Sequence, residues 1–148
     1  MRSALVFVHL CSVAVWVGGM FFAQFCLRPA AFQLLEPPQR LALMAGALAR
    51  FFRWVGLAIL LLWLTGLARM VNVGFAAAPP AWHAMLTIAL VMTVVFAVIA
   101  HAVFPRVRVA LAAQRYAEAA AGLARVRVLV TINLGLGLLT IAVATLGR

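Results

Sequence analysis

Three histidines are the residues of this chain best suited to chemistry, because each lies in or at the end of a long apolar stretch. The first, His9, is followed closely by CSVAVWVGGMFF, a run with one tryptophan and a Gly-Gly pair. An ionisable side chain inside a bilayer is costly, so it is a candidate for function by default. His9, His83 and His101 are therefore the first residues to consider for a functional site.

Two imidazoles from different helices predict a metal or haem site. Neutral imidazole binds copper, and the methionine thioether is a soft ligand that suits Cu(I). Met70 and Met85 stand near the ends of the second and third apolar stretches, so we expect a copper site built from His9, His83, Met85 and Met70. The same histidines could instead be axial ligands of haem b, with Arg69 meeting a propionate. Interfacial hydrogen bonding of the histidines and ordinary packing of the methionines are the competing interpretations.

The composition predicts which elements must position these residues. The chain has 148 residues, of which 68% are hydrophobic and 9% charged, with a mean hydropathy of +1.19. It contains four apolar runs of about 20 residues, the length of a helix that crosses a bilayer. We expect an all-α polytopic membrane protein, a single transmembrane domain over residues 1–148. Its fold is an antiparallel bundle of four transmembrane helices with cytoplasmic helical extensions. The expected helices cover about residues 3–27, 39–73, 80–104 and 123–147, and the first is an uncleaved spanning helix.

The arginines are unevenly distributed. All 12 basic residues are arginines, there are two acids (Glu36 and Glu118), and the net charge is +10. Nine arginines fall between the first and second or between the third and fourth predicted helices, which is the positive-inside pattern. We therefore expect a bacterial inner membrane protein with cytoplasmic basic loops, both termini in the periplasm, and membrane lipids rather than nucleic acid as partners. Arg2, Arg69 and Arg148 are on the periplasmic side.

Helix periodicity assigns faces to the candidate residues. His9, Ser12, Trp16, Gly19, Met20 and Ala23 share one face of the first helix, which should turn inward because it carries small and polar residues. A second inward stripe is expected on the third helix, where His83, Thr87, Leu90, Val94 and His101 share a face. His9 and His83 would then lie at a similar depth near the periplasmic surface. His101 and Cys26 are the soft ligands of a secondary site near the inner surface.

The prolines predict where the chain bends. Pro29 should end or kink the first helix, and Pro105 should end the third. Pro38 can start the second helix, because proline is tolerated in the first helical turn. Residues 107–122 carry arginines among alanines and are expected to form one amphipathic helical extension.

Two segments resemble known families. HLCSVAVWVGGMFF is similar to the first-helix signature of the CopD family of copper-resistance membrane proteins, and to that of the related HemJ family of four-helix membrane proteins linked to protoporphyrinogen oxidation and haem b. WHAMLTIALVMTVVFAVIAHAVFPRVR resembles the third-helix pattern of both, with a histidine near each end. The resemblance implies a role for His9, Trp16, His83 and His101, with Trp16 beside a haem if one is bound. HemJ-like sequences usually place a lysine shortly after the third-helix histidine, where this chain has Ala84-Met85-Leu86.

These observations favour a metal-handling membrane protein, with copper binding, transport or delivery at the periplasmic end and a periplasmic copper carrier as partner. The alternative is a b-type haem protein that exchanges electrons with a respiratory partner, and would be a haem-dependent oxidoreductase if it is an enzyme. A third possibility is a structural accessory subunit of a membrane complex. The chain has no aspartate, and no Ser-His-acid set for hydrolysis can be assembled. The oligomeric state stays open.

Overall fold

The computed structural model describes the backbone of residues 2–147 and the side chains of residues 3–147. Arg148 and the Arg2 side chain, both used in the charge argument above, lie outside these residues. The described chain is all α, as predicted. Its elements are α1 (Arg2–Val13), η1 (Ala14–Gly18), α2 (Gly19–Phe22), η2 (Ala23–Leu27), α3 (Arg28–Leu34), α4 (Pro37–Val73), η3 (Phe75–Ala77), α5 (Pro80–Val98), η4 (Ile99–Val103), α6 (Phe104–Ala112) and α7 (Tyr116–Leu146).

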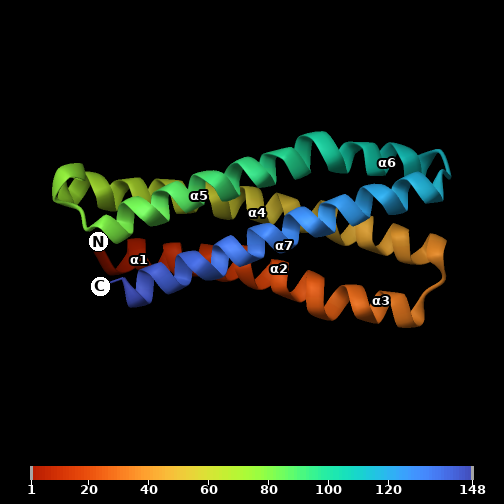
Figure 1. The fold of residues 1–148 in the computed structure, drawn as a ribbon, viewed down its shortest axis with the longest axis horizontal. Helices are drawn as coiled ribbons and strands as arrows, with labels where there is room; N and C mark the ends of the chain where they lie inside the picture. The colour runs from red at the N-terminus through yellow and green to blue at the C-terminus, as the bar shows by residue number, and fades with distance from the viewer. Residues whose placement is uncertain (1, 148) are drawn as a thin grey trace.

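These elements join into four long helices that run antiparallel (Figure 1). Four continuous stretches are long and apolar enough to cross a membrane: Ser3–Leu34, Pro37–Val73, Pro80–Ala112 and Tyr116–Leu146. The helix α1 packs along α4, while α5 and α6 pack along α7. The expected four-helix membrane bundle is therefore confirmed.

The two ends of the bundle differ in what they contain. Both chain termini and the connection between α4 and α5 lie at one end, which we call the terminal end (Figure 1). The connections between α3 and α4 and between α6 and α7 lie at the other end. We call this the basic end, since the two arginine-rich segments identified in the sequence meet there. At the terminal end Gly74 stops α4 with a φ of 87°, a value that glycine adopts without a steric penalty.

Large apolar side chains cover the outside of the bundle. Phe7, Leu60 and Leu64 are 69%, 55% and 59% exposed, and similar residues recur along all four helices. Such a surface is unfavourable in water but matches the interior of a bilayer, where lipid tails are as apolar as leucine. The exposed apolar surface thus agrees with the length and composition of the four helices.

The first and third helices continue past their prolines, contrary to expectation. Pro29 lies in the first turn of α3, directly after the π-helical turn η2, and Pro105 lies in the first turn of α6, directly after the π-helical turn η4. Proline is disruptive because it lacks an N–H and its ring collides with the carbonyl four residues earlier. A wider turn before the proline changes the local hydrogen-bond pattern, so each helix continues to the basic end.

The segment over residues 107–122 is not one helical extension. The helix α6 ends at Ala112, a turn follows, and α7 begins at Tyr116. Gln114 has a φ of 57° in this turn, and the N–H of Arg115 donates to the carbonyl of Ala110 over 2.8 Å. The alanine-rich composition gave no glycine or proline to mark the turn. The arginines on both sides of it consequently belong to two antiparallel helices.

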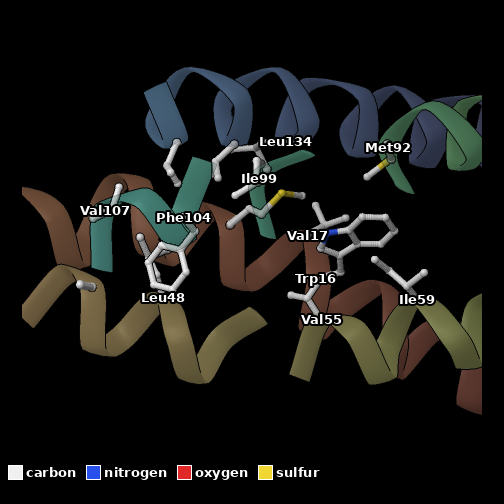
Figure 2. Close-up of a cluster of buried hydrophobic side chains, with 14 residues drawn as sticks. Trp16, Val17, Leu48, Val55, Ile59, Met92, Ile99, Phe104, Val107 and Leu134 are labelled. Carbon is white, nitrogen blue, oxygen red and sulfur yellow. The ribbon is translucent and has the colours of Figure 1, made fainter. Parts of the chain in front are cut away.

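The centre of the bundle is filled by apolar side chains. Figure 2 shows Trp16 and Val17 from the first helix against Met92, with Ile99 and Leu134 beside them. Trp16 is 4% exposed and its ring meets Phe96 edge to face, with 6.5 Å between the ring centroids. Interlocking aromatic and branched side chains of this kind leave the helices little freedom to slide.

Four hydrogen bonds between side chains and neighbouring helices close the bundle into a ring. His9 Nδ1 lies 2.8 Å from Thr65 Oγ1, which joins α1 to α4. Trp63 Nε1 donates to Thr93 Oγ1 over 3.1 Å, joining α4 to α5. Asn133 Nδ2 donates to the Met92 carbonyl over 3.2 Å, joining α7 to α5. Gln24 Nε2 donates to Thr131 Oγ1 over 2.9 Å, joining η2 to α7.

Gly137 allows α7 to approach both the first and the third helices closely. A Cβ at this position would lie 2.9 Å from Val17 Cγ2 and 3.3 Å from Met92 Cε, whereas a Cβ at Gly135 would meet nothing within 4 Å. We expect Gly137→Ala to lower the free energy of unfolding by about 1–3 kcal/mol, the usual cost of overpacking. Gly135→Ala is the matched control and should be neutral or stabilising by up to about 1 kcal/mol.

Denaturant titration of the detergent-solubilised protein, followed by circular dichroism, measures both variants. Equal stabilities of the two variants would show that α7 does not depend on close packing at Gly137.

Candidate functional site

His9 lies on α1 and faces α4. Its imidazole is half-buried, and its Nδ1 atom is within hydrogen-bond distance of Thr65 Oγ1. Ser12, Trp16 and Met20 are buried on the same face. The predicted inward face of the first helix is therefore confirmed, and Thr65 is the partner that places His9 on it.

The Thr65 hydroxyl determines which ring nitrogen of His9 carries the proton. A hydroxyl has one hydrogen, and Thr65 directs it to the Leu61 carbonyl 2.7 Å away on its own helix. Thr65 Oγ1 must then accept a hydrogen from His9 Nδ1. The same arrangement occurs at Thr93, which donates to the Ala89 carbonyl and accepts from the indole of Trp63, a group that can only donate. In its neutral form the His9 imidazole therefore carries the proton on Nδ1 and the lone pair on Nε2.

His83 lies at the start of α5, at the terminal end of the bundle. Its side chain is exposed, and its Nε2 donates to the Phe75 carbonyl in the connection between α4 and α5, over 3.1 Å. The carbonyl can only accept, so the lone pair of the neutral ring is on Nδ1. Like His9, His83 has one nitrogen held by the protein and one nitrogen available as a ligand.

A small cavity opens between α1, α4 and α5 at the terminal end. Its volume is about 180 Å³, and it is lined by Leu5, Val6, Arg69, Asn72, Val73 and Trp82. The Arg69 guanidinium lies over the Trp82 ring, 4.7 Å from its centroid. Arg69 is also a positively charged neighbour of His9. The cavity is therefore lined by one cation and one amide, and the cation is a neighbour of the His9 imidazole.

The two predicted methionine ligands differ in burial. Met70 is 3% exposed on α4, where its carbonyl accepts the N–H of Gly74 at the end of the helix. Met85 is half-buried on α5, two residues after His83. Trp16 is packed in the apolar centre against Phe96.

The predicted inward stripe on the third helix is wrong. All five of its residues, His83, Thr87, Leu90, Val94 and His101, are exposed. The buried side of this helix is formed by Met92, Ile99 and Phe104, which pack in the central cluster. Polarity was a poor guide here because histidines near helix ends can hydrogen-bond outside the bundle, as His83 does with Phe75.

The structure gives the predicted ligands separate partners. His9 bonds to Thr65 and His83 bonds to Phe75, and within residues 3–147 no group of three or more His, Cys, Asp or Glu side chains could together hold a metal ion. Cys26 lies in η2 and His101 in η4, and both side chains are exposed. The terminal end thus offers single imidazole nitrogens, supplemented by thioethers, rather than a closed multidentate site.

Sequence reasoning missed Thr65, the residue that orients His9. The residues around His9 in the sequence do not indicate Thr65 as its partner, because the two residues are 56 positions apart in the chain. The available clue was that threonines are the commonest hydroxyl-bearing residues in these apolar runs and can accept a hydrogen bond while donating to their own helix.

The fold and the terminal-end groups define a helical membrane protein with four spanning segments and an oriented histidine between its first two helices. A family model described as a domain of unknown function (DUF4149) matches residues 11–117, most of the chain, so the chain belongs to that family. The matched residues include His83 and His101 and begin two positions after His9. No curated protein and no solved structure matches the chain.

Replacing Thr65 tests the orientation of His9. Thr65→Val keeps the shape of the side chain but removes the acceptor, so His9 should lose its fixed Nδ1–H tautomer and the protein should be destabilised by about 0.5–2 kcal/mol. Thr140→Val is the matched control, since the Thr140 hydroxyl bonds only to the Leu136 carbonyl of its own helix.

The ¹⁵N chemical shifts of labelled histidine report the tautomer, and denaturant titration reports the stability. A His9 signal that is the same in the wild type and in Thr65→Val would contradict the assigned role of Thr65.

Proposed function

We propose that this protein binds copper as Cu(I) at the terminal end of the bundle and delivers it to a partner, with His9 as the principal protein ligand. The observation that carries the proposal is the hydrogen bond between His9 and Thr65, which leaves His9 Nε2 with its lone pair. Histidines that bind metals commonly have the other ring nitrogen held in this way, which fixes both the tautomer and the ring orientation.

His83 supplies the second imidazole. Its exposed position and free Nδ1 suit first contact with an ion at the surface, whereas His9 is half-buried. Met70 and Met85 are the thioether ligands of the same end. Arg69 lies near His9, and a positive neighbour opposes a divalent ion more strongly than a monovalent one, which favours Cu(I).

Delivery fits the interior of the bundle better than permeation. Below His9 the centre is closed by Trp16, Val55, Met92, Ile99 and Leu134, all of them buried. An ion that crosses the bundle needs ligands to replace its water, and among these side chains only the thioether of Met92 can act as one. Copper that reaches the terminal end would therefore leave from the same end, and a periplasmic copper carrier is the partner class that this requires.

The orientation follows from the arginines. The segments that meet at the basic end carry Arg28, Arg40, Arg50, Arg53, Arg106, Arg108, Arg115, Arg125 and Arg127, whereas Arg69 lies towards the terminal end. In a bacterial inner membrane the positive-inside rule supports a cytoplasmic basic end, so we propose that the terminal end, with His9 and His83, faces the periplasm.

Haem is the alternative group that the same histidines could bind. The arrangement of the residues around them does not fit a haem. The cavity between α1, α4 and α5 is lined by neither histidine and measures about 180 Å³, whereas sites for drug-sized ligands and cofactors occupy roughly 300–1,000 Å³. His9 and His83 are also held by different partners, Thr65 and Phe75, rather than facing one another across a slot.

Copper binding can be measured by competition between the purified protein and a coloured Cu(I) chelator. We expect the wild type to bind Cu(I) and His9→Ala to lose at least tenfold in affinity. Thr65→Val should lose about tenfold, the usual effect of removing the group that holds a metal-binding histidine. His101→Ala, at the other end of the same helix as His83, is the control and should retain wild-type affinity.

The visible spectrum of the same preparation separates the alternatives. A Soret band that disappears in His9→Ala would replace copper with haem as the ligand. A protein that binds neither copper nor haem would support the accessory-subunit interpretation. Wild-type copper affinity in both His9→Ala and His83→Ala would place the metal elsewhere in the chain.

A further inference from the structure

Two arginines at the basic end share one aromatic ring. The guanidinium carbon of Arg28 lies 4.5 Å from the centroid of the Phe32 ring, and that of Arg40 lies 3.9 Å from it. Arg28 and Phe32 belong to α3, and Arg40 belongs to the first turn of α4. The ring therefore gathers two cations from two helices at the hairpin that joins them.

A third arginine reaches the same place from α7. Gln24 and Thr131 are hydrogen-bonded across the seam between η2 and α7. These helices are antiparallel, so one turn further along each of them Arg28 comes beside Arg127. The charges of Arg127 and Arg40 both act on the Arg28 guanidinium. Three like charges are thus held together by parts of the chain that are far apart in sequence.

No acid forms an ion pair with this cluster within the described part of the chain. The ion pair recorded among residues 3–147 joins Arg115 to Glu118 on α7, with a separation of 2.8 Å. Arg40 Nε is buried and has no hydrogen-bond partner. Cations packed this closely repel one another, and a buried N–H without an acceptor is costly, so the cluster would gain from an anion that accepts several hydrogen bonds.

An exposed aromatic stripe leads from the cluster along the first helix. Phe21 and Phe25 are 52% and 58% exposed, and their ring centroids are 4.9 Å apart. Phe21 and Phe25 are one helical turn apart, and Phe32, which is 49% exposed, follows about two turns later. The stripe runs from the basic end towards the middle of the membrane-spanning segment. An acyl chain would follow the same direction if its headgroup were bound at the arginine cluster.

We propose that Arg28, Arg40 and Arg127 bind the phosphate of an anionic phospholipid, whose acyl chain lies along Phe21 and Phe25. Guanidinium groups present paired N–H donors that match phosphate oxygens, and a phosphate supplies the acceptor that Arg40 Nε lacks. The bound lipid bridges α3, α4 and α7. This site is at the opposite end of the bundle from His9 and does not depend on the copper proposal.

Native mass spectrometry of the detergent-solubilised protein tests the site. The probes are an anionic diacyl phospholipid, phosphatidylcholine with the same chains, and inorganic phosphate. We expect the anionic lipid to bind at least tenfold more tightly than phosphatidylcholine. Removing one charge with Arg127→Gln should weaken the anionic lipid roughly fivefold. Arg125→Gln is the matched control, because it removes the same charge from an exposed position two residues away on another face of α7.

A second variant tests the acyl path. Phe25→Asn should weaken the anionic lipid but leave all arginines in place, and its helical content by circular dichroism should match the wild type. Equal losses in Arg127→Gln and Arg125→Gln would overturn the proposal in favour of a general charge effect. Competition by millimolar inorganic phosphate with no effect of Phe25→Asn would overturn it in favour of a site for free phosphate.

Discussion

The structure depends on how polar side chains are satisfied in a bundle whose exterior is apolar. Water is scarce around such helices, so a buried polar group must find its partner within the protein. Three of the four ties between helices use a threonine in the same way. Each of these hydroxyls donates to a carbonyl of its own helix and accepts from a side chain of the next: Thr65 from His9, Thr93 from Trp63, and Thr131 from Gln24. The donor is therefore always the longer side chain, and the threonine decides where it points.

This rule gives His9 its chemical character. An imidazole free to rotate at a helix surface would exchange tautomers and offer either nitrogen, whereas an imidazole bound through Nδ1 to a hydroxyl that has no spare hydrogen offers only Nε2. Trp63 follows the same rule but has no second nitrogen, so its bond to Thr93 is purely structural. Whether such a hydrogen bond only joins two helices or also prepares a metal ligand thus depends on the donor side chain and not on the threonine that accepts from it. His9 is the one donor of the three that can also offer a nitrogen lone pair to a metal.

The helices could be predicted from the sequence because hydropathy acts over about 20 residues and needs no knowledge of partners. The inward face of the first helix was predicted correctly as well, since small and polar residues there coincide with Trp16 and Met20. The same reasoning failed on the third helix, where the exposed His83 bonds to a loop carbonyl and apolar Met92 and Ile99 face inward. Polarity therefore indicated the inward face of the first helix but not that of the third. The helix ends expected at Pro29 and Pro105 were wrong because the effect of each proline depends on the π-helical turn before it. Such a turn leaves no local signal in the sequence.

The irregular turns of the first helix follow from its two different neighbours. Near the terminal end His9 ties it to α4 through Thr65, and near the basic end Gln24 ties it to α7 through Thr131. A regular helix keeps one face towards one neighbour. Here two side chains that are 15 positions apart must reach two different neighbours, so the rotation of the helix about its axis has to change between them. The wide turns η1 and η2 occur in this interval or at its end, and Gly19, whose missing Cβ leaves room for the Phe51 ring, lies between them. The lipid proposed at Arg28 and the copper proposed at His9 would therefore bind to opposite ends of one helix. At each end a threonine of a neighbouring helix holds the direction in which the helix faces.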